Sequence, residues 1–196
     1  MHATGARTPF TVLLVCTANR YRSPVAEHLL RAELAARADW VIGSAGTQAR
    51  EGEELDSRVA ALVGVPSGDA GSWRSRRLTA QLVEQADLVL TAEEAHRQVV
   101  VQMWPRALHH TFALLSFARL AAQLPNESVA SGHALIEAVN QARTHTQPPQ
   151  AGADDIVDPV RHLRRKLPAC AGQIRGAVTA LSAPLVPMRV AANHAR

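Results

Sequence analysis

One stretch near the start of the chain decides the fold: Phe10-Thr-Val-Leu-Leu-Val-Cys16-Thr-Ala-Asn-Arg-Tyr-Arg22-Ser23-Pro24. The apolar run from Val12 to Val15 is too short for a helix and rich in β-branched residues, so it predicts a strand that is buried on both faces. Pro24 suits the first position of a helix, and Ser23 beside it can cap that helix. The stretch therefore predicts a strand, a tight loop and the start of a helix.

The residues after Pro24 support the helix. From Val25 to Leu34 the apolar residues recur at helical spacing, and Glu27 lies in the expected first turn, where the helix dipole favours a negative charge. A loop ahead of a helix N-terminus points backbone N–H groups at one spot and so favours an anion. The loop from Cys16 to Tyr21, followed by Arg22, is therefore a candidate anion site.

The residue types in this loop suit attack on a phosphate. A thiol that faces a helix N-terminus and an arginine loses its proton readily, and the thiolate is the form that attacks. Arg22 offers a planar fork that can hold two phosphate oxygens. Asn19 tolerates the left-handed conformation that converging N–H groups need, and Ser23 can donate a hydrogen bond to the sulfur of Cys16. Together these groups could bind a phosphate dianion and attack its phosphorus.

The spacing Cys-x5-Arg alone is weak evidence, because Lys and Arg make up 21 of the 196 residues and all but Lys166 are arginine. The alternative for Cys16 is a small core residue, since free cysteine is among the most buried types. The strand before the loop, the Ser-Pro helix start after it and Asn19 within it favour the phosphate site.

The loop also resembles a known one. Cys16 to Pro24 is similar to the phosphate loop of the low-molecular-weight protein tyrosine phosphatases, and further motifs of that family follow in order. They are Ser44-Ala45-Gly46-Thr47, then Arg76-Arg77-Leu78-Thr79 with Ala86-Asp87-Leu88-Val89-Leu90-Thr91, then Phe112-Ala-Leu-Leu-Ser-Phe117, and Asp155-Ile-Val-Asp158-Pro159. The resemblance covers about residues 10–181. It implies that Cys16 is the nucleophile, Arg22 the phosphate-binding arginine and Asp158 the general acid. The loop residues expected to bind phosphate are Thr17, Ala18, Asn19, Arg20, Tyr21 and Ser23.

Asp158 has a chemical reason for this role. A carboxylic acid over the loop can protonate the departing oxygen of a phosphomonoester and then deprotonate the water of the second step. The family carries this acid in an Asp-Pro pair, which Asp158-Pro159 matches. The alternative is that Asp158 caps the helix that follows. Asp154 and Asp155 are rivals, but neither precedes a proline.

Several positions depart from the family pattern. Val160 stands where many members have an aromatic residue that lines the pocket for a phosphorylated ring, which leaves the substrate open. Tyr21 replaces a second loop cysteine, and Ala18 replaces a glycine. Trp73 falls near where relatives have a histidine that supports the loop asparagine. Arg20 could reach a second anionic group on a substrate.

A run of basic residues follows the Asp-Pro pair: Arg161, Arg164, Arg165 and Lys166. These residues could attract acidic phosphopeptides to the site, or they could form the solvated face of a helix.

Composition limits the function class. The chain has an apolar content of 47%, a net charge of +4 and two cysteines, Cys16 and Cys170, so it is expected to form one globular domain without a disulfide framework. We expect Cys170 to be a core residue of the last helix.

The cysteines and histidines do not show the spacing of a metal site, and no cofactor is expected. The arginines are not interleaved with aromatic residues, as they are in nucleic-acid binders. The apolar run at 10–16 is too short to span a membrane. A working thiolate suits a reducing compartment, so we expect a cytoplasmic enzyme that acts on a phosphorylated protein or another phosphomonoester. The sequence does not indicate an oligomeric state.

The rest of the chain predicts an α/β fold. Strands alternate with helices, which favours a three-layer architecture with a four-stranded parallel sheet flanked by helices and the phosphate loop after strand 1. The resemblance implies the strand order 2-1-3-4. Further strands are expected at 40–45, 86–91 and 109–112, and helices at 57–63, 78–85, 92–104, 114–124, 129–142 and 168–181. We expect one domain over 10–185, an inserted segment at about 125–150, and flexible tails at 1–9 and 186–196.

The predicted function is that of a phosphomonoester hydrolase, of the protein tyrosine phosphatase type, with a cysteinyl-phosphate intermediate. One alternative is an arsenate reductase, a class of redox enzyme that resembles the phosphatases in fold and loop. Its thioredoxin-coupled forms need two further cysteines close to the loop, and this chain has only Cys170. An inactive phosphate-binding module is the other alternative, against which the presence of Cys16, Arg22 and Asp158 argues.

Overall fold

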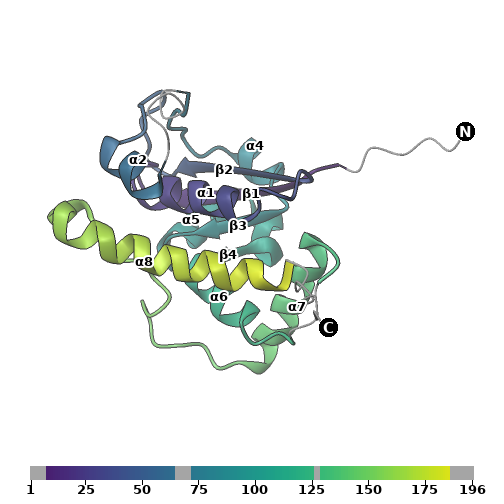
Figure 1. Ribbon diagram of the computed structural model, residues 1–196. Coiled ribbons are helices and arrows are strands. Elements are labelled where there is room, and N and C mark those ends of the chain that lie inside the picture. Colours follow the sequence, from purple (N-terminus) through teal and green to yellow (C-terminus); the bar gives the residue numbers. More distant parts are fainter. Residues whose placement is uncertain (1–7, 65–71, 126–128, 186–196) are drawn as a thin grey trace, which may run out of the picture.

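The computed structural model describes residues 8–64, 72–125 and 129–185. Its centre is a parallel sheet with the strand order β2-β1-β3-β4, which confirms the predicted order (Figure 1). The strands are β1 (Phe10–Cys16), β2 (Trp40–Gly46), β3 (Leu88–Thr91) and β4 (Thr111–Ala113). β1 pairs with β2 along its whole length, so Cys16 lies opposite Gly46 at the carboxyl edge of the sheet.

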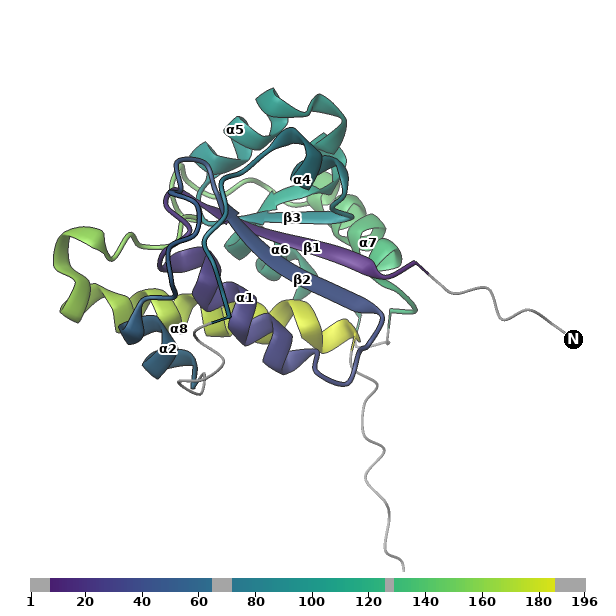
Figure 2. The same ribbon diagram turned by 90° about the horizontal axis from the view of Figure 1, so that it is seen from above.

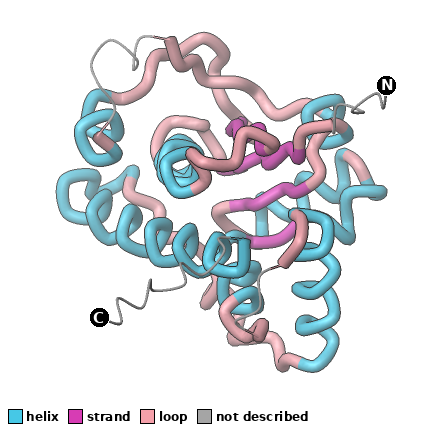
Figure 3. The backbone as a smooth tube through the Cα atoms, turned by 45° about the vertical axis from the view of Figure 1, so that its right-hand side comes forward, coloured by secondary structure: helices cyan, strands magenta, loops and turns pink. Residues whose placement is uncertain are grey.

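Helices cover both faces of the sheet, as predicted. They are α1 (Arg22–Glu33), α2 (Ser57–Val63), α4 (Ala80–Glu84), α5 (Glu94–Met103), α6 (Leu114–Ala121), α7 (Gly132–His145) and α8 (Leu163–Ser182). The described residues also form the 3₁₀ turns Pro105–His110, Val160–His162 and Ala183–Leu185, which lie between or after these helices. Figure 2 shows α5 on one side of the sheet and α1 and α8 on the other. Figure 3 shows the strands enclosed by helices.

The alternation of β1 explains why it is central. Val12 and Leu14 belong to the larger core, which includes residues of α1, α6 and α8. Leu13 and Val15 belong to the smaller core, which includes residues of α4 and α5. Because side chains of a strand alternate between faces, a strand with apolar residues at successive positions joins both cores. This burial confirms the reading of the apolar run.

Two helix starts differ from the sequence prediction. α1 begins at Arg22, not at Pro24, and its cap residue Tyr21 makes no capping hydrogen bond through its side chain. Glu27 consequently lies beyond the first turn. α8 begins at Leu163, and Pro168 lies inside it rather than at its start.

Packing accounts for the longer α8. A proline inside a helix lacks an N–H and crowds the carbonyl four residues earlier, so it usually marks a helix start or a break. Here Leu167 and Cys170 on either side of Pro168 are both buried. Burial of side chains on both sides of the proline favours a continuous helix across it.

The other boundaries shift by a few residues. The expected strand at 109–112 starts at Thr111, because His109 and His110 complete the preceding 3₁₀ turn. The helix expected in the inserted segment is α7, and its first residue, Gly132, packs against Phe10: a Cβ there would lie 2.5 Å from that ring. The predicted tail residues 1–7 and 186–196 and residues 126–128 of the insertion lie outside the described residues.

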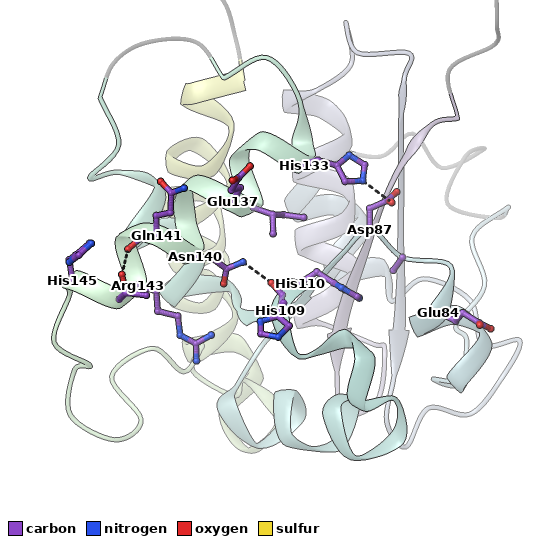
Figure 4. A pocket seen from close by; sticks show the side chains of 13 residues that line it. Glu84, Asp87, His109, His110, His133, Glu137, Asn140, Gln141, Arg143 and His145 are labelled. Atoms are coloured by element: carbon purple, nitrogen blue, oxygen red, sulfur yellow. Dashed lines mark hydrogen bonds and ion pairs between the residues drawn. The ribbon is translucent and has the colours of Figure 1, made fainter.

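A cavity of about 1220 Å³ opens at the amino ends of β3 and β4, where α7 covers the sheet (Figure 4). His133 Nε2 lies 3.3 Å from Asp87 Oδ1 at its rim, and Asn140 Nδ2 donates to the His109 carbonyl at 2.8 Å. Within the described segments, no cluster of three or more His, Cys, Asp or Glu side chains is arranged to hold a metal ion. None of the predicted site residues lines this cavity, which lies at the sheet edge opposite to the phosphate loop.

In the described parts of the chain, no helix combines the length and the apolar character needed to cross a membrane.

Candidate active site

The loop between β1 and α1 is shaped by Asn19. Among the described residues it is the only non-glycine residue with a positive φ, at 50°, and it is fully buried. Its side-chain oxygen accepts a hydrogen bond from the backbone N–H of Arg76 at 2.8 Å. Because asparagine adopts the left-handed region more readily than most residues, this position suits the turn of the loop.

Asn19 also connects the loop to the cysteine. Its Nδ2 donates to Ser23 Oγ at 2.9 Å and to Ser44 Oγ at 2.8 Å. Ser23 Oγ in turn lies 3.0 Å from Cys16 Sγ. Since the Ser23 hydroxyl accepts from Asn19, its own hydrogen can point at the sulfur or at the more distant Ala45 carbonyl, 3.4 Å away.

The buried carboxylate of Glu27 extends this hydrogen-bond network. Glu27 Oε2 accepts a short hydrogen bond from Ser44 Oγ and one from Trp73 Nε1 at 3.1 Å, while Oε1 pairs with Arg31 at 2.7 Å. Glu27 therefore anchors Ser44, which Asn19 contacts, rather than serving the helix dipole as the sequence suggested. Trp73 takes part in the support of Asn19 through two intervening side chains.

Gly46 lets the loop approach β2. A Cβ at this position would lie 2.6 Å from both Asn19 N and Thr17 O, which are backbone atoms that cannot move aside without moving the loop. The backbone N–H groups of the next two residues, Thr47 and Gln48, donate to the carbonyls of Cys16 and Thr17 at 2.9 and 2.8 Å. The Ser-Ala-Gly-Thr motif thus fixes the path of the first half of the loop.

The guanidinium of Arg22 is buried and held on one side. Nη1 donates to Glu93 Oε1 in a short ion pair and to the Ile156 carbonyl at 3.3 Å. Nη2 lies 3.4 Å from Thr17 Oγ1 and 3.8 Å from Asp158 Oδ2. Within the described residues Nε has no partner, so the edge formed by Nε and Nη2 is the one available to a ligand.

The surroundings of Arg22 favour its charge. Burial alone would lower its pKa, but the hydrogen bond with Glu93 and the nearby charges of Cys16 and Glu93 raise it above its ordinary value. The charge of Asp158 acts in the same direction. The loop therefore keeps a permanent cation beside the cysteine.

His96 reaches the loop from α5. Its Nε2 lies 2.8 Å from Thr17 Oγ1, and its Nδ1, which is buried, has no hydrogen-bond partner in the described chain and lies 3.9 Å from Glu93 Oε2. Burial lowers the pKa of His96, with the charge of Glu93 acting in the opposite direction. A neutral imidazole consequently contacts the hydroxyl of Thr17 at neutral pH.

Asp158 lies over the loop and is half exposed, with 51% of its side chain accessible. Its Oδ1 accepts from the Val160 N–H at 3.1 Å, as a capping residue would, while Oδ2 faces Arg22. The rivals are engaged elsewhere: Asp154 pairs with Arg119 at 2.8 Å, and Asp155 accepts from the backbone N–H of Glu94. Of the three aspartates, Asp158 is the one paired with Arg22.

Tyr21 and Arg20 extend from the loop toward α2. Asp56 accepts from Arg58 at 2.8 Å and from the Tyr21 hydroxyl at 3.3 Å, and it lies 3.6 Å from Arg20. The hydrogen bond with Arg58 is the main reason that the pKa of Asp56 falls to about 2. Burial, followed by the charge of Asp56, raises the pKa of Tyr21.

The structure thus brings together the residues predicted for this site. Cys16, Arg22 and Ser23 are buried at its floor, Asp158 lies above them, and the side chain of Arg20 is directed away toward Asp56. Sequence reasoning did not identify Glu93, His96 or the carbonyl of Ile156. The signal for Glu93 was its position two residues after β3, since the carboxyl ends of parallel strands share one edge of the sheet.

Comparison with known proteins points in one direction. The family model of the low molecular weight phosphotyrosine protein phosphatases matches residues 11–127. A protein-arginine-phosphatase of Geobacillus stearothermophilus is 33% identical over 109 residues, which cover 56% of this chain and 72% of that protein. A low molecular weight protein-tyrosine-phosphatase of Acinetobacter johnsonii is 32% identical over 103 residues, which cover 53% and 70%.

Solved structures agree with the fold. The tyrosine phosphatase AmsI of Erwinia amylovora superposes with a TM-score of 0.63 at 25% identity, covering 95% of this chain and 99% of that one. An arginine phosphatase from Geobacillus stearothermophilus superposes with a TM-score of 0.63 at 24% identity, covering 89% and 91%. The latter likeness extends to the fold alone.

Proposed function

The chain belongs to the low molecular weight phosphotyrosine protein phosphatase family, and from this premise we propose that it hydrolyses phosphomonoesters through a phosphocysteine at Cys16. In this proposal Arg22 binds the phosphoryl group and Asp158 is the general acid and base. The observation that carries it is the convergence of these groups: Arg22 begins α1 directly after the loop that follows Cys16, and its Nη2 is 3.8 Å from Asp158.

The first step forms the phosphocysteine. The Cys16 thiolate, which Ser23 stabilises by a hydrogen bond, attacks phosphorus, and the bond from phosphorus to the leaving oxygen breaks. Asp158 gives its proton to that oxygen, so that the dephosphorylated product leaves as a neutral alcohol or phenol while the phosphoryl group stays on Cys16. The free edge of Arg22 and the backbone N–H groups of the loop, residues 17–23, hold the equatorial oxygens as charge redistributes.

The second step returns the enzyme to its starting form. Asp158, now a carboxylate, takes a proton from water while the water oxygen attacks phosphorus. The bond between sulfur and phosphorus breaks, inorganic phosphate leaves, and Cys16 is again a thiolate. The fixed position of Arg22 serves both steps because the phosphoryl group stays bound between them.

We propose phosphotyrosine in proteins as the substrate, which the family name and a tyrosine phosphatase of 32% identity support. The protein-arginine-phosphatase among the relatives makes phosphoarginine the alternative. Turnover of matched peptides that carry one or the other modification distinguishes the two. The two free cysteines suit a reducing, cytoplasmic compartment.

Turnover of para-nitrophenyl phosphate tests the proposal. Cys16→Ser should reduce turnover to less than about one per cent of the wild-type rate, the usual size of a nucleophile knockout, while the protein still folds.

Asp158→Ala should slow the hydrolysis of an aryl phosphate with a basic leaving group by roughly 10²–10⁴-fold. It should slow the hydrolysis of one with an acidic leaving group far less. If both substrates slow equally, Asp158 is not the acid. Consumption of thiol that depends on arsenate would instead indicate a reductase.

A further inference from the structure

The 3₁₀ turn before α8 and the first turn of α8 carry a group of cations next to the site. We call Arg161, Arg164, Arg165 and Lys166 the α8 basic patch. The three arginines are exposed, and Lys166 is partly exposed. No aspartate or glutamate occurs from Pro159 to the last residue of the chain, so nothing in the same segment balances these charges.

Helix stability does not explain this arrangement. The N-terminus of a helix is the positive end of its dipole, where acidic side chains stabilise and cations destabilise. The first turn of α8 contains no acidic residue, and Arg164 and Arg165 are its second and third residues. The patch therefore opposes the dipole of the helix that carries it.

The charges of the patch are also unpaired. The exposed Arg58 differs in this respect, because its guanidinium pairs with Asp56 at 2.8 Å. Among the residues that the structure describes, no member of the α8 basic patch makes an ion pair or a side-chain hydrogen bond. An exposed cluster of unpaired cations raises the local concentration of anions around it.

The patch adjoins the mouth of the site. It begins three residues after Asp158, whose Oδ2 faces Arg22, so the backbone of Arg161 lies at most about 11 Å from that of Asp158. This is close to the Debye length of about 10 Å at 0.1 M salt, so the patch acts on groups that flank a bound phosphate. Figures 1 and 2 show the start of α8 at the same end of the molecule as α2, on the edge where the loop after β1 lies.

The other residues near the site also provide positive charge for a ligand, and they provide little aromatic surface. The guanidinium carbons of Arg20 and Arg58 lie 5.6 and 5.9 Å from the centre of the Tyr21 ring, so cations already occupy the surroundings of this ring. Both arginines share one carboxylate, Asp56, which leaves a positive excess. Val160, beside the acid, is 60% exposed and provides no aromatic surface.

We propose that the α8 basic patch binds acidic side chains that flank the phosphorylated residue, so that the enzyme selects phosphopeptides with carboxylates around the phosphate. This inference rests on the proposed phosphatase function. An acidic peptide is favoured over an anionic membrane because the patch adjoins the catalytic mouth and because the apolar side of α8 is buried in the core.

The test compares two phosphotyrosine peptides of equal length, one flanked by glutamates and one by glutamines. At about 0.02 M salt kcat/KM should be about tenfold higher for the acidic peptide, and at about 0.5 M salt the ratio should approach one, because charges beyond a few ångström are then screened. The double variant Arg164→Gln/Arg165→Gln should lose most of the preference at low salt. Its turnover of para-nitrophenyl phosphate, which has no flanking charge, should not change.

The double variant Arg106→Gln/Arg175→Gln is the matched control. It removes the same charge from exposed positions outside the patch, and it should keep the preference for the acidic peptide. The inference would be overturned if both double variants lost the preference for the acidic peptide equally. It would also be overturned if the wild type had equal kcat/KM for the two peptides and normal turnover of para-nitrophenyl phosphate. Either result would leave the proposed function intact. No turnover of para-nitrophenyl phosphate by the wild type would overturn both. Loss of binding to phosphatidylserine vesicles in the patch variant, with an unchanged peptide preference, would overturn the inference in favour of a membrane surface.

Discussion

The guanidinium of Arg22 has two edges, and the protein occupies one of them. Glu93 and the carbonyl of Ile156 hold Nη1, whereas Nη2 lies near Thr17 of the loop and Nε has no partner among the described residues. A buried arginine without such a partner would be free to rotate about its long side chain, and misplacement of a binding group by a fraction of an ångström costs rate. Glu93 therefore acts on the reaction through the orientation of Arg22, as a positioning residue.

Replacing Glu93 tests this role. Glu93→Ala should lower kcat/KM for an aryl phosphate by about 10- to 100-fold, because Nη1 loses its charged partner. Glu93→Gln should keep most of the activity, since its amide oxygen still accepts from Nη1, and should bind inorganic phosphate more tightly because one negative charge beside the anion is gone. Steady-state kinetics with phosphate as inhibitor measures both effects. Glu94→Ala, which removes the exposed neighbour that pairs with Arg97, is the control; an equal loss in the two alanine variants would show that Glu93 does not orient Arg22.

Gly46 is the second position where a single residue decides the shape of the loop. Gly46→Ala would put a Cβ 2.6 Å from two backbone atoms of the loop, so the loop must shift. We expect a loss of about 1–3 kcal/mol in the free energy of unfolding, as in overpacked cores, together with a large loss of turnover. Urea unfolding and para-nitrophenyl phosphate hydrolysis give the two quantities.

Gly176→Ala is the control for that change. A Cβ at Gly176 meets nothing within 4 Å, and the residue lies inside α8, where alanine is favoured over glycine by about 0.5–1 kcal/mol. The control should be more stable than the wild type and equally active. If Gly46→Ala behaved like Gly176→Ala, the close approach of β2 to the loop would not matter.

At the scale of elements, the start of α8 combines an unfavourable dipole with an exposed position. Arg164→Glu/Arg165→Glu should raise the free energy of unfolding by about 1–2 kcal/mol, because two cations at the positive end of the helix become anions and the remaining cations repel each other less. Thermal unfolding should show a Tm higher by roughly 2–8 °C. Arg175→Glu, in the middle of the same helix, should change the Tm little, since the dipole acts within the end turns. A fall in Tm for the double variant would show that these arginines stabilise α8.

How far the sequence predicts each element depends on how local its cause is. The strand, loop and helix start from Phe10 to Pro24 follow from neighbours in sequence, and they were predicted to within two residues. The start of α8 was wrong by five residues, because Pro168 is a local signal that the burial of Leu167 and Cys170 overrides.

The site shows the same division. Cys16, Arg22 and Asp158 lie in motifs whose residue types reveal their chemistry. Glu93 and His96 have no such motif, and their contact with the loop depends on β3 pairing next to β1. Contacts that depend on strand order follow from the sequence only after the topology is known.

The whole molecule should be sensitive to acid because several histidines are partly buried in different parts of it. Burial lowers the pKa of His28, of His96 and of His110. The unfolded chain binds protons at these positions near pH 6.5, whereas the folded chain does so only at lower pH. The unfolded state therefore gains more protons as the pH falls below about 6.5, and the free energy of unfolding should decrease from that point downward.

Urea unfolding at about pH 7.5 and pH 5.5, values on either side of the ordinary histidine pKa, measures this dependence. The double variant His28→Gln/His110→Gln should lose less stability between the two pH values than the wild type. His162→Gln removes an exposed histidine and should keep the wild-type dependence. If the double variant lost as much stability between the two pH values as the wild type, groups other than His28 and His110 would cause the acid sensitivity.

The two thiols of the molecule should differ in their response to peroxide. Cys16 and Cys170 are both free, and they lie in the loop and in α8. Burial, to which the charges of Cys16 and Asp158 add, raises the pKa of Cys170 to about 12, although Arg22 acts in the opposite direction. A disulfide forms when a thiolate attacks the oxidised sulfur, and at neutral pH Cys170 is almost entirely a thiol.

We therefore expect excess peroxide to drive Cys16 through sulfenic to sulfinic acid, so that dithiothreitol recovers little activity. Mass spectrometry should find added oxygen on the Cys16 peptide and no link to Cys170. Cys170→Ala should be inactivated and recover to the same small extent; full recovery in the wild type but not in this variant would show that Cys170 captures the oxidised Cys16 despite its burial.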